Sequence, residues 1–382
     1  MTLLPYSLAQ DRANARFASG EQQQNKLLEQ IASMVIRDKL VAPRAMNFIV
    51  REKDVALRYS TQVGMNMRSS DDQVVTLHRH ALGQLAGKVE LPITFLNKLN
   101  TFTGEEWRPE LLAHNLNTLF HNTAFERGSE NPRFLHRIVG TELRGFLSRR
   151  FNRHLASLPL LRAFVESVRQ AEAIPIEATT TDLRWTLKCY LPMVFEAFAG
   201  QYICVGVAES NSDFGAGKLS ITQTIWDPCR DTKTVLDESI SRVHLGSVLE
   251  DSDIEVSDDT AVKEVEAQAG AIRDAVKQLL APEAVNKALM AIKLAHEAEI
   301  PWHQLKSQLA RILYDKEVAT VETLLNSPDI MDLPPVGRDS KGDPLPTRWW
   351  ASTVITALAK NESDERKMEL QQHAGKFLSM EK

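Results

Sequence analysis

The sequence contains few residues of the kinds that mark secreted, membrane-embedded or metal-binding proteins. Only three of its 382 residues are cysteine, and Cys189, Cys204 and Cys229 lack the paired spacing of a zinc site. Reduced thiols of a cytoplasmic protein are therefore expected. No apolar run reaches the roughly 18 residues of a transmembrane helix, so we expect no membrane-spanning segment. The amino terminus lacks a basic region followed by an apolar block, which argues against a secretory signal.

Recognised catalytic motifs are also missing. The string FGAGK at residues 214–218 resembles a phosphate-binding loop, but Ser212 stands where such a loop needs a glycine, and leucine follows the lysine. His296 has no second histidine at zinc-protease spacing. A nuclease-like pairing of Asp182 with Lys188 has no metal-ligand partner in the sequence. We therefore predict no catalytic residue, no metal and no cofactor, and leave enzymatic activity open.

The sequence does contain an arginine-rich segment at residues 133–153, RFLHRIVGTELRGFLSRRFNR. Six arginines stand there against one acid, Glu142, with three phenylalanines among them. Guanidinium groups form paired hydrogen bonds with phosphate, and aromatic rings stack on bases, so the segment indicates a polyanionic partner. The alternative interpretation is two amphipathic strands with arginines in solvent and phenylalanines in the core.

We predict that these arginines contact DNA phosphates. Strict alternation along a strand places Arg144, Phe146 and Ser148 on one face, so we expect Phe146 or Phe151 to stack on bases if either ring is exposed, and Phe134 to lie in the core. Arg184 and Lys188 of a later strand either extend the basic surface or face water. The predicted nucleic-acid-binding set is Arg133, Arg137, Arg144, Phe146, Arg149, Arg150, Phe151, Arg153, Arg184 and Lys188.

Charge is distributed unevenly along the chain. Residues 1–155 contain 21 Lys and Arg against 15 Asp and Glu, whereas the rest of the chain contains 24 and 35. A basic amino-terminal part is expected of a protein that binds nucleic acid. The opposite balances also suit head-to-tail contact between copies, so we predict a homo-oligomer, with packing of both parts inside one monomer as the alternative.

The length and the hydrophobic pattern predict an α+β protein in three parts. Residues 1–130 are expected to be helix-rich, with a first helix from about Gln22 to Asp38 and a hairpin around Glu52–Asp54. Residues 131–249 are expected to form a strand-rich core with a curved, mainly antiparallel sheet near 133–226, because short turns favour antiparallel pairing. A mixed sheet, with the helix at 158–171 as crossover, is the alternative.

The third part, residues 250–382, is predicted to be an acidic linker followed by a helical carboxy-terminal region. Flanking helices on the sheet and this helical region complete the predicted fold class. Trp349 and Trp350 are predicted to be packing anchors, because large aromatic side chains are used more often in this way than as ligand platforms.

The string FLSRRFNRHLASLPLLRAFVESV, residues 146–168, resembles the signature of a family of phage, prophage and plasmid proteins catalogued as a domain of unknown function, family 932. In that family a string like RAFLSDRYRRIDN precedes a helix. Further matches are LPITFLNKL, ELLAHNLNTLF, VGVAESNSDFGAGKLSITQTIWDPC and SRVHLGSVLE, and the resemblance spans roughly residues 74–249. Arg149 stands where aspartate is usual, and Arg230-Asp231 where asparagine-glycine is usual. The resemblance implies a mobile genetic element, a setting in which DNA recombination, replication and counter-defence proteins are common.

From these features we expect a DNA-binding protein of a phage or plasmid, of a single-strand annealing or recombination-mediator type. Annealing needs a basic groove that neutralises two strands, and it needs no catalytic group. Two alternatives stay open. One is a phage structural or protein-interaction protein without nucleic-acid binding, favoured by the acidic helical part. The other is a metal-dependent nuclease with a dispersed site.

Overall fold

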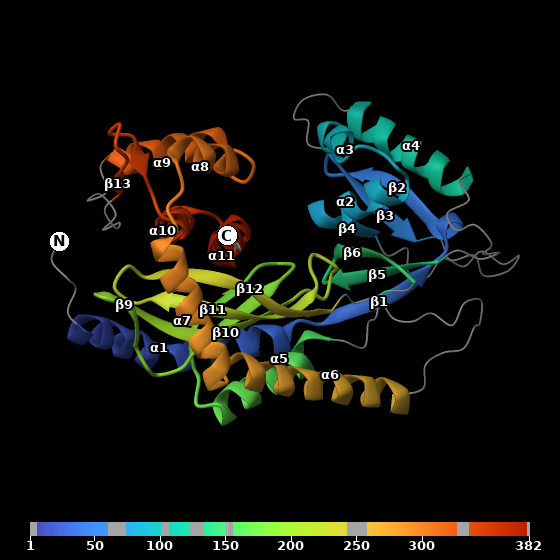
Figure 1. Cartoon of the computed structure of the whole chain (residues 1–382). Helices are drawn as coiled ribbons and strands as arrows, with labels where there is room; N and C mark the ends of the chain where they lie inside the picture. Colours follow the sequence, from blue (N-terminus) through green and yellow to red (C-terminus); the bar gives the residue numbers. More distant parts are fainter. Residues whose placement is uncertain are drawn as a thin grey trace, which may run out of the picture.

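The computed structural model describes residues 6–59, 74–100, 107–122, 133–149, 151, 156–242, 258–326 and 336–379. Two six-stranded sheets form its scaffold (Figure 1). Helices cover one face of the first sheet and both faces of the second. The fold is therefore the expected α+β type with mainly antiparallel sheets and a helical carboxy-terminal region.

The first sheet combines strands from the amino-terminal part with the arginine-rich segment. Its strands are β1 (Ile36–Val41), β2 (Met46–Arg51), β3 (Asp54–Tyr59), β4 (Val74–Leu77), β5 (Phe134–Val139) and β6 (Glu142–Ser148), and the short helix η1 (Pro43–Ala45) joins β1 to β2. Their order is β1-β5-β6-β4-β3-β2, and only the β4–β6 pair is parallel. The hairpin predicted around Glu52–Asp54 is confirmed as β2–β3.

Three helices cover one face of the first sheet: α2 (Arg79–Lys88), α3 (Ile93–Asn100) and α4 (Trp107–Asn122). Alternation along β2 explains which of its residues the helices cover. Met46 and Phe48 are buried, whereas Asn47 and Ile49, which point to the opposite face, are half-buried. Asn117 of α4 fixes the helix on the sheet, since its side chain accepts a hydrogen bond from the Phe48 N–H and donates one to the Phe48 carbonyl.

The second sheet is built from β7 (Ile174–Thr180), β8 (Trp185–Tyr190), β9 (Phe195–Phe198), β10 (Gln201–Asn211), β11 (Leu219–Asp227) and β12 (Thr232–Arg242). These strands are antiparallel, in the order β12-β11-β10-β8-β7, with β9 paired to β10. All six residues of β8 are buried. Both faces of this strand are therefore covered, although its alternating sequence had predicted one solvent-facing side.

The two faces of the second sheet are covered by different sets of helices. One face packs against α5 (Ser157–Gln170), α6 (Asp258–Leu279) and α7 (Pro282–Glu297). The other face packs against the first half of α1 (Tyr6–Ser33) and against α11 (Asp364–Ser379). In Figure 1, α5 and α6 run along one side of this sheet, and α10 and α11 lie on the opposite side.

The carboxy-terminal region is helical, as predicted. It continues from α7 through α8 (Trp302–Leu309), α9 (Asp315–Asn326), the hairpin β13 (Gly337–Arg338) and β14 (Pro344–Leu345), α10 (Arg348–Leu358) and η3 (Ala359–Asn361) to α11. Trp349 and Trp350 are buried in two separate apolar clusters, which confirms that they are packing anchors. None of the helices within the described ranges is long and apolar enough to cross a membrane.

The loop between β10 and β11, residues 212–218, joins the two sheets. The Phe214 carbonyl accepts a hydrogen bond of 2.9 Å from the Gln84 side chain and lies 3.1 Å from His80 Nε2, both on α2. Arg137 of β5 donates to the Asp213 carbonyl at 2.6 Å. This loop contains the FGAGK string. The turn that resembled a phosphate-binding loop therefore connects the second sheet to α2 and β5.

Three fold expectations need correction. The single sheet predicted near 133–226 is two sheets, because β5 and β6 pair with β1 and β4 rather than with the later strands. The expected boundary at residue 131 therefore divides one sheet. The helix predicted at Gln22–Asp38 instead runs from Tyr6 to Ser33, and Asp38 lies in β1, whose partner β5 is about a hundred positions away in the sequence.

Candidate functional site

A β-bulge overturns the predicted role of Phe146. In the β5–β6 ladder Arg137 pairs with Gly145 but Ile138 pairs with Leu143, so Arg144 is an extra residue in β6. The bulge places Leu143 and Phe146 on the same, helix-covered face. Phe146 is 1% exposed and its ring packs 5.0 Å from that of Phe134. Phe134 is in the core as predicted, and Phe146 cannot stack on a base.

Two predicted phosphate ligands are buried and paired. Arg137 forms a 3.0 Å ion pair with Asp38 and is 4% exposed. Lys188 donates to Gln371 of α11 at 2.7 Å and lies 3.4 Å from Glu177. Burial lowers the pKa of Lys188 to about 8, against the opposing effect of Glu177. The expectation that Arg137 and Lys188 contact DNA was wrong, because buried charges are stabilised by fixed partners.

The other predicted residues have different surroundings, and the exposed Arg133 and Arg149 are neighbours at the end of the β5–β6 pair where Phe134 pairs with Ser148. Arg144 pairs with Glu142 at 2.7 Å and donates to the Asp182 carbonyl. Arg133 and Arg149 are exposed, whereas Phe151 is half-buried beside Arg137. Arg184 lines a cavity that carboxylates also line. Two further predicted residues, Arg150 and Arg153, lie outside the described residues.

A cleft with basic walls lies at a different place, between α1, the β11–β12 turn and η3. Its volume is about 770 Å³. The charged residues that line it, among those described, are four basic and one acidic: Arg12, Arg16, Arg230, Lys360 and Asp231. We call this the cationic cleft. Trp226 contributes to its floor but is 1% exposed, so its ring is a support and not a stacking surface.

Two of the four basic side chains are held by carbonyl groups, and neither forms an ion pair with an acid in the described part of the chain. Arg12 donates to the Cys229 carbonyl, and Lys360 donates to the Arg230 carbonyl. A carbonyl fixes the position of a cation without cancelling its charge. The other two are ion-paired, Arg16 with Asp231 at 2.5 Å and Arg230 with Asp227 at 2.6 Å. The cleft therefore has an excess of positive charge, carried by side chains whose positions are fixed by these partners.

The acid in the cleft is itself stabilised as a carboxylate. Burial raises the pKa of Asp231, but Lys233 and then Arg16 outweigh burial, so that the pKa is lowered. The Trp226 indole N–H also donates to Asp231, at 3.0 Å. Asp231 thus holds Arg16 in place at the mouth of the cleft.

Two tyrosines lie near the cleft. Tyr6, at the start of α1, is 50% exposed, and its ring meets that of Tyr202 in β10 edge to face at 5.6 Å. Arg12 lies about 1.7 helical turns further along α1 and donates to the carbonyl of Cys229. Burial, then Glu196 and then Cys229 raise the pKa of Tyr202, so Cys229 lies in the neighbourhood of Tyr202. Tyr6 is exposed and Tyr202 is half-buried, and both lie outside the lining of the cleft. Aromatic rings in the neighbourhood of fixed cations are a combination of groups that binds single-stranded nucleic acid.

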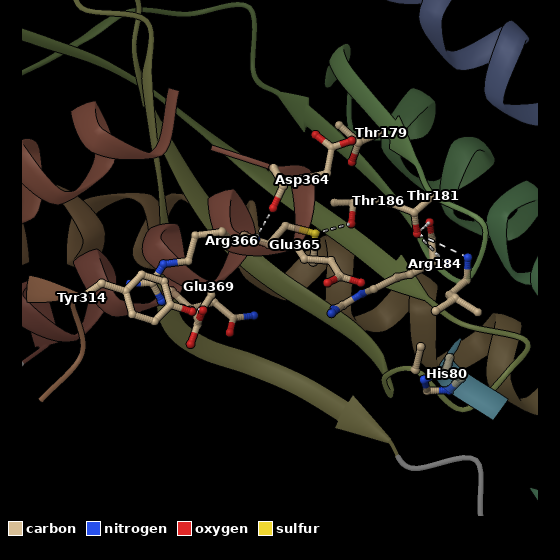
Figure 2. Close-up of a pocket in the computed structure, with 15 residues that line it drawn as sticks. His80, Thr179, Thr181, Arg184, Thr186, Tyr314, Asp364, Glu365, Arg366 and Glu369 are labelled. Atoms are coloured by element: carbon tan, nitrogen blue, oxygen red, sulfur yellow. Dashed lines mark hydrogen bonds and ion pairs between the residues drawn. The ribbon is translucent and has the colours of Figure 1, made fainter. Parts of the chain in front are cut away.

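A second cavity, of about 510 Å³, lies where the two sheets and the carboxy-terminal helices meet (Figure 2). His80 of α2 lines one end, and burial is the main cause that lowers the pKa of its imidazole. Arg184 and residues of α11 line its sides. We call this the junction cavity. Three carboxylates line the same cavity, so the surroundings of Arg184 are not a purely basic surface.

The sequence did not indicate the cationic cleft, because its four basic residues span almost the whole chain. The single signal was Arg230, at a position where the resembled family usually has another residue. No group of three or more His, Cys, Asp or Glu that suits a metal ion occurs within the described ranges.

Comparison of the chain with models of protein families, with curated proteins and with solved structures finds no match.

Proposed function

We propose that this protein binds nucleic acid through the cationic cleft, with single-stranded DNA as the favoured ligand. The observation that carries the proposal is the pair Arg12 and Lys360, whose charges are fixed by backbone carbonyls and are not neutralised by any acid among the described residues. A phosphodiester backbone supplies the missing anions, and its binding releases the counterions condensed on the nucleic acid.

Two further features favour a single strand. The Tyr6–Tyr202 pair offers aromatic surface in the neighbourhood of the cations, and unpaired bases stack on such surface without regard to sequence. The cleft itself is a confined space between a helix and a turn, and it suits one flexible backbone better than a duplex. The finer role that we propose is strand annealing or recombination mediation for a phage or plasmid, in agreement with the family resemblance.

The test is fluorescence anisotropy with labelled single- and double-stranded oligonucleotides over a series of salt concentrations. We expect the triple variant Arg12→Ala, Arg16→Ala, Lys360→Ala to bind single-stranded DNA at least tenfold more weakly, since electrostatic contacts supply most of such affinity. Each lost phosphate contact flattens the log–log salt slope by about 0.7, so the slope should fall by about 2. Replacing Arg12 and Arg16 with lysine keeps the charge and should keep the slope.

The matched control removes three exposed basic residues on α6 and α7 that do not line the cleft: Arg273, Lys277 and Lys293. This control has the same net charge as the triple cleft variant and should bind like the wild type. Circular dichroism establishes that both variants are folded. A folded cleft variant with unchanged affinity and unchanged salt slope would contradict the proposal. Annealing of complementary labelled strands then tests the finer role.

We also propose that the protein forms a homo-oligomer. Helices α3 and α4 expose Ile93, Phe95, Trp107 and Leu111, and this apolar surface belongs to the basic amino-terminal part of the chain. The acidic carboxy-terminal part of a second copy has a charge opposite to that of this basic part, so the two parts would attract each other. Light scattering at physiological salt should give a mass above the 42.9 kDa of one chain, and Trp107→Ser should lower that mass. A wild-type mass equal to one chain would exclude this assembly.

A further inference from the structure

The junction cavity brings together three segments that are far apart in the sequence. Figure 2 shows Arg184 and threonines of the β7–β8 pair on one side, the first turns of α11 on the other, and His80 of α2 at one end. Its volume of about 510 Å³ lies within the range of about 300–1,000 Å³ that is typical of small-molecule sites. Groups of both charges line it, in contrast to the cationic cleft.

Arg184 is held rigidly just before β8. The Thr181 N–H donates to the Arg184 carbonyl at 2.7 Å, and the Arg184 N–H donates to the Thr181 hydroxyl at 3.1 Å. In the guanidinium, Nη2 donates to the Ser210 hydroxyl at 2.7 Å and Nε is buried, while Nη1 forms no hydrogen bond within the described residues. A fixed guanidinium with an unused donor is suited to bind a carboxylate, because it offers planar, directed hydrogen bonds.

The opposite wall presents carboxylates from the first turns of α11. Glu369 is ion-paired with Arg366 at 2.6 Å, so its charge is compensated. Asp364 and Glu365 are exposed, and within the described part of the chain neither forms an ion pair. Burial lowers the pKa of Arg184, and the charge of Glu365 opposes that effect. An uncompensated cation and uncompensated carboxylates thus line one cavity without a direct bond between them.

We infer that the junction cavity binds a free α-amino acid. The ligand carboxylate accepts hydrogen bonds from Arg184, and its ammonium group donates to Glu365, the carboxylate of the facing wall whose charge acts on Arg184. Leu183, Met368 and Tyr314 line the same cavity and provide contact for the ligand side chain. The inference does not depend on nucleic-acid binding, since none of these residues lines the cationic cleft.

The first experiment is a thermal-shift screen of the full-length protein with each standard L-amino acid at millimolar concentration. Propionate and ethylamine serve as probes that retain only one of the two charged groups of alanine. We expect at least one amino acid to raise the melting temperature by about 2 °C or more, because a ligand that binds only the folded state stabilises it. Titration calorimetry then gives the dissociation constant.

Two variants separate the two charged contacts. Arg184→Gln should weaken binding of the amino acid about tenfold or more, because it removes a charge-assisted contact. Glu365→Gln, at an exposed position, should also weaken binding of the amino acid but leave the binding of propionate as tight as in the wild type or tighter, because one negative charge near Arg184 is removed. Glu362 and Arg311 do not line the cavity, so the control variants Glu362→Gln and Arg311→Gln should bind the amino acid as tightly as the wild type. The inference is overturned if no amino acid binds the wild type, or if folded Glu365→Gln binds the amino acid as tightly as the wild type.

Discussion

At the scale of single residues, Glu209 has the environment that conflicts most with its chemistry. It lies in β10 opposite Leu187 of β8, on the face that α5 and α6 cover, and it is 0% exposed. Neither of its carboxyl oxygens has a hydrogen-bond partner among the described residues, and the same holds for the indole nitrogen of Trp185 in the next strand. Burial raises the pKa of Glu209 well above its ordinary value, so the folded protein holds the neutral acid.

Replacement of Glu209 by glutamine should therefore stabilise the protein, and increasingly so at higher pH. The unfolded chain releases the Glu209 proton above about pH 4.5 while the folded protein keeps it, so wild-type stability falls as pH rises through that region. Glutamine has a similar shape and no proton to lose. The advantage of the variant should grow by up to about 1.4 kcal/mol per pH unit, until the pH reaches the pKa of the folded state.

Melting temperatures of wild type and Glu209→Gln at pH 5 and pH 8 test this expectation. Other titrating groups are common to both proteins and cancel in the difference. A difference in melting temperature that is the same at both pH values would show that Glu209 is already ionised, or solvated, in the folded protein.

At the scale of secondary-structure elements, two glycines allow the backbones of α1 and α11 to approach strands of the second sheet closely. A Cβ atom at Gly375 of α11 would lie 1.7 Å from the Val235 carbonyl oxygen of β12, and one at Gly20 of α1 would lie 1.5 Å from the Pro175 carbonyl oxygen of β7. Glycine inside a helix costs about 1 kcal/mol relative to alanine. Glycine is nevertheless required at these two positions, because any side chain would separate the helix backbone from the strand.

Gly375→Ala should destabilise the protein by about 2 kcal/mol or more, because the clash is with backbone and α11 must move away from β12. The matched control is Gly270→Ala in α6, where an added Cβ meets no atom within 4 Å. That control should stabilise the protein by up to about 1 kcal/mol. Urea unfolding followed by tryptophan fluorescence measures both, and a Gly375→Ala variant as stable as the control would disprove the close approach.

Local patterns predicted some elements and not others, for physical reasons. The β2–β3 hairpin and the helices of the carboxy-terminal region depend on neighbouring residues, so alternation and helical spacing were enough to find them. Strands β1 and β4 are short, and their partners β5 and β6 are far away in the sequence. The bulge at Arg144 is a property of the β5–β6 pair, and no pattern within one strand reveals it.

At the scale of the whole molecule, the two sheets are joined by buried polar contacts. Arg137 of the first sheet bonds to Asp38 in its own sheet and to the carbonyl of Asp213 in the loop of the second. The Asp213 carboxylate accepts a hydrogen bond from the N–H of Ser157 at the start of α5. The arginine-rich segment was singled out as a binding surface, but its most buried arginine joins the sheets. The candidate sites lie where remote segments meet, and sequence spacing cannot show such meetings.

The cationic cleft contains Arg12 and Arg16 from α1 and Lys360 from η3, more than 300 residues later in the chain. On the ribosome, α1 emerges long before β7, the strand that it packs against, and long before η3. A nascent chain that already displays Arg12 thus has no cleft, and any truncated product that ends before residue 360 lacks it as well. Nucleic-acid binding at this place would therefore begin only after residue 360 has been synthesised and folded against α1, so chains that have not reached this point would not bind DNA through the cleft.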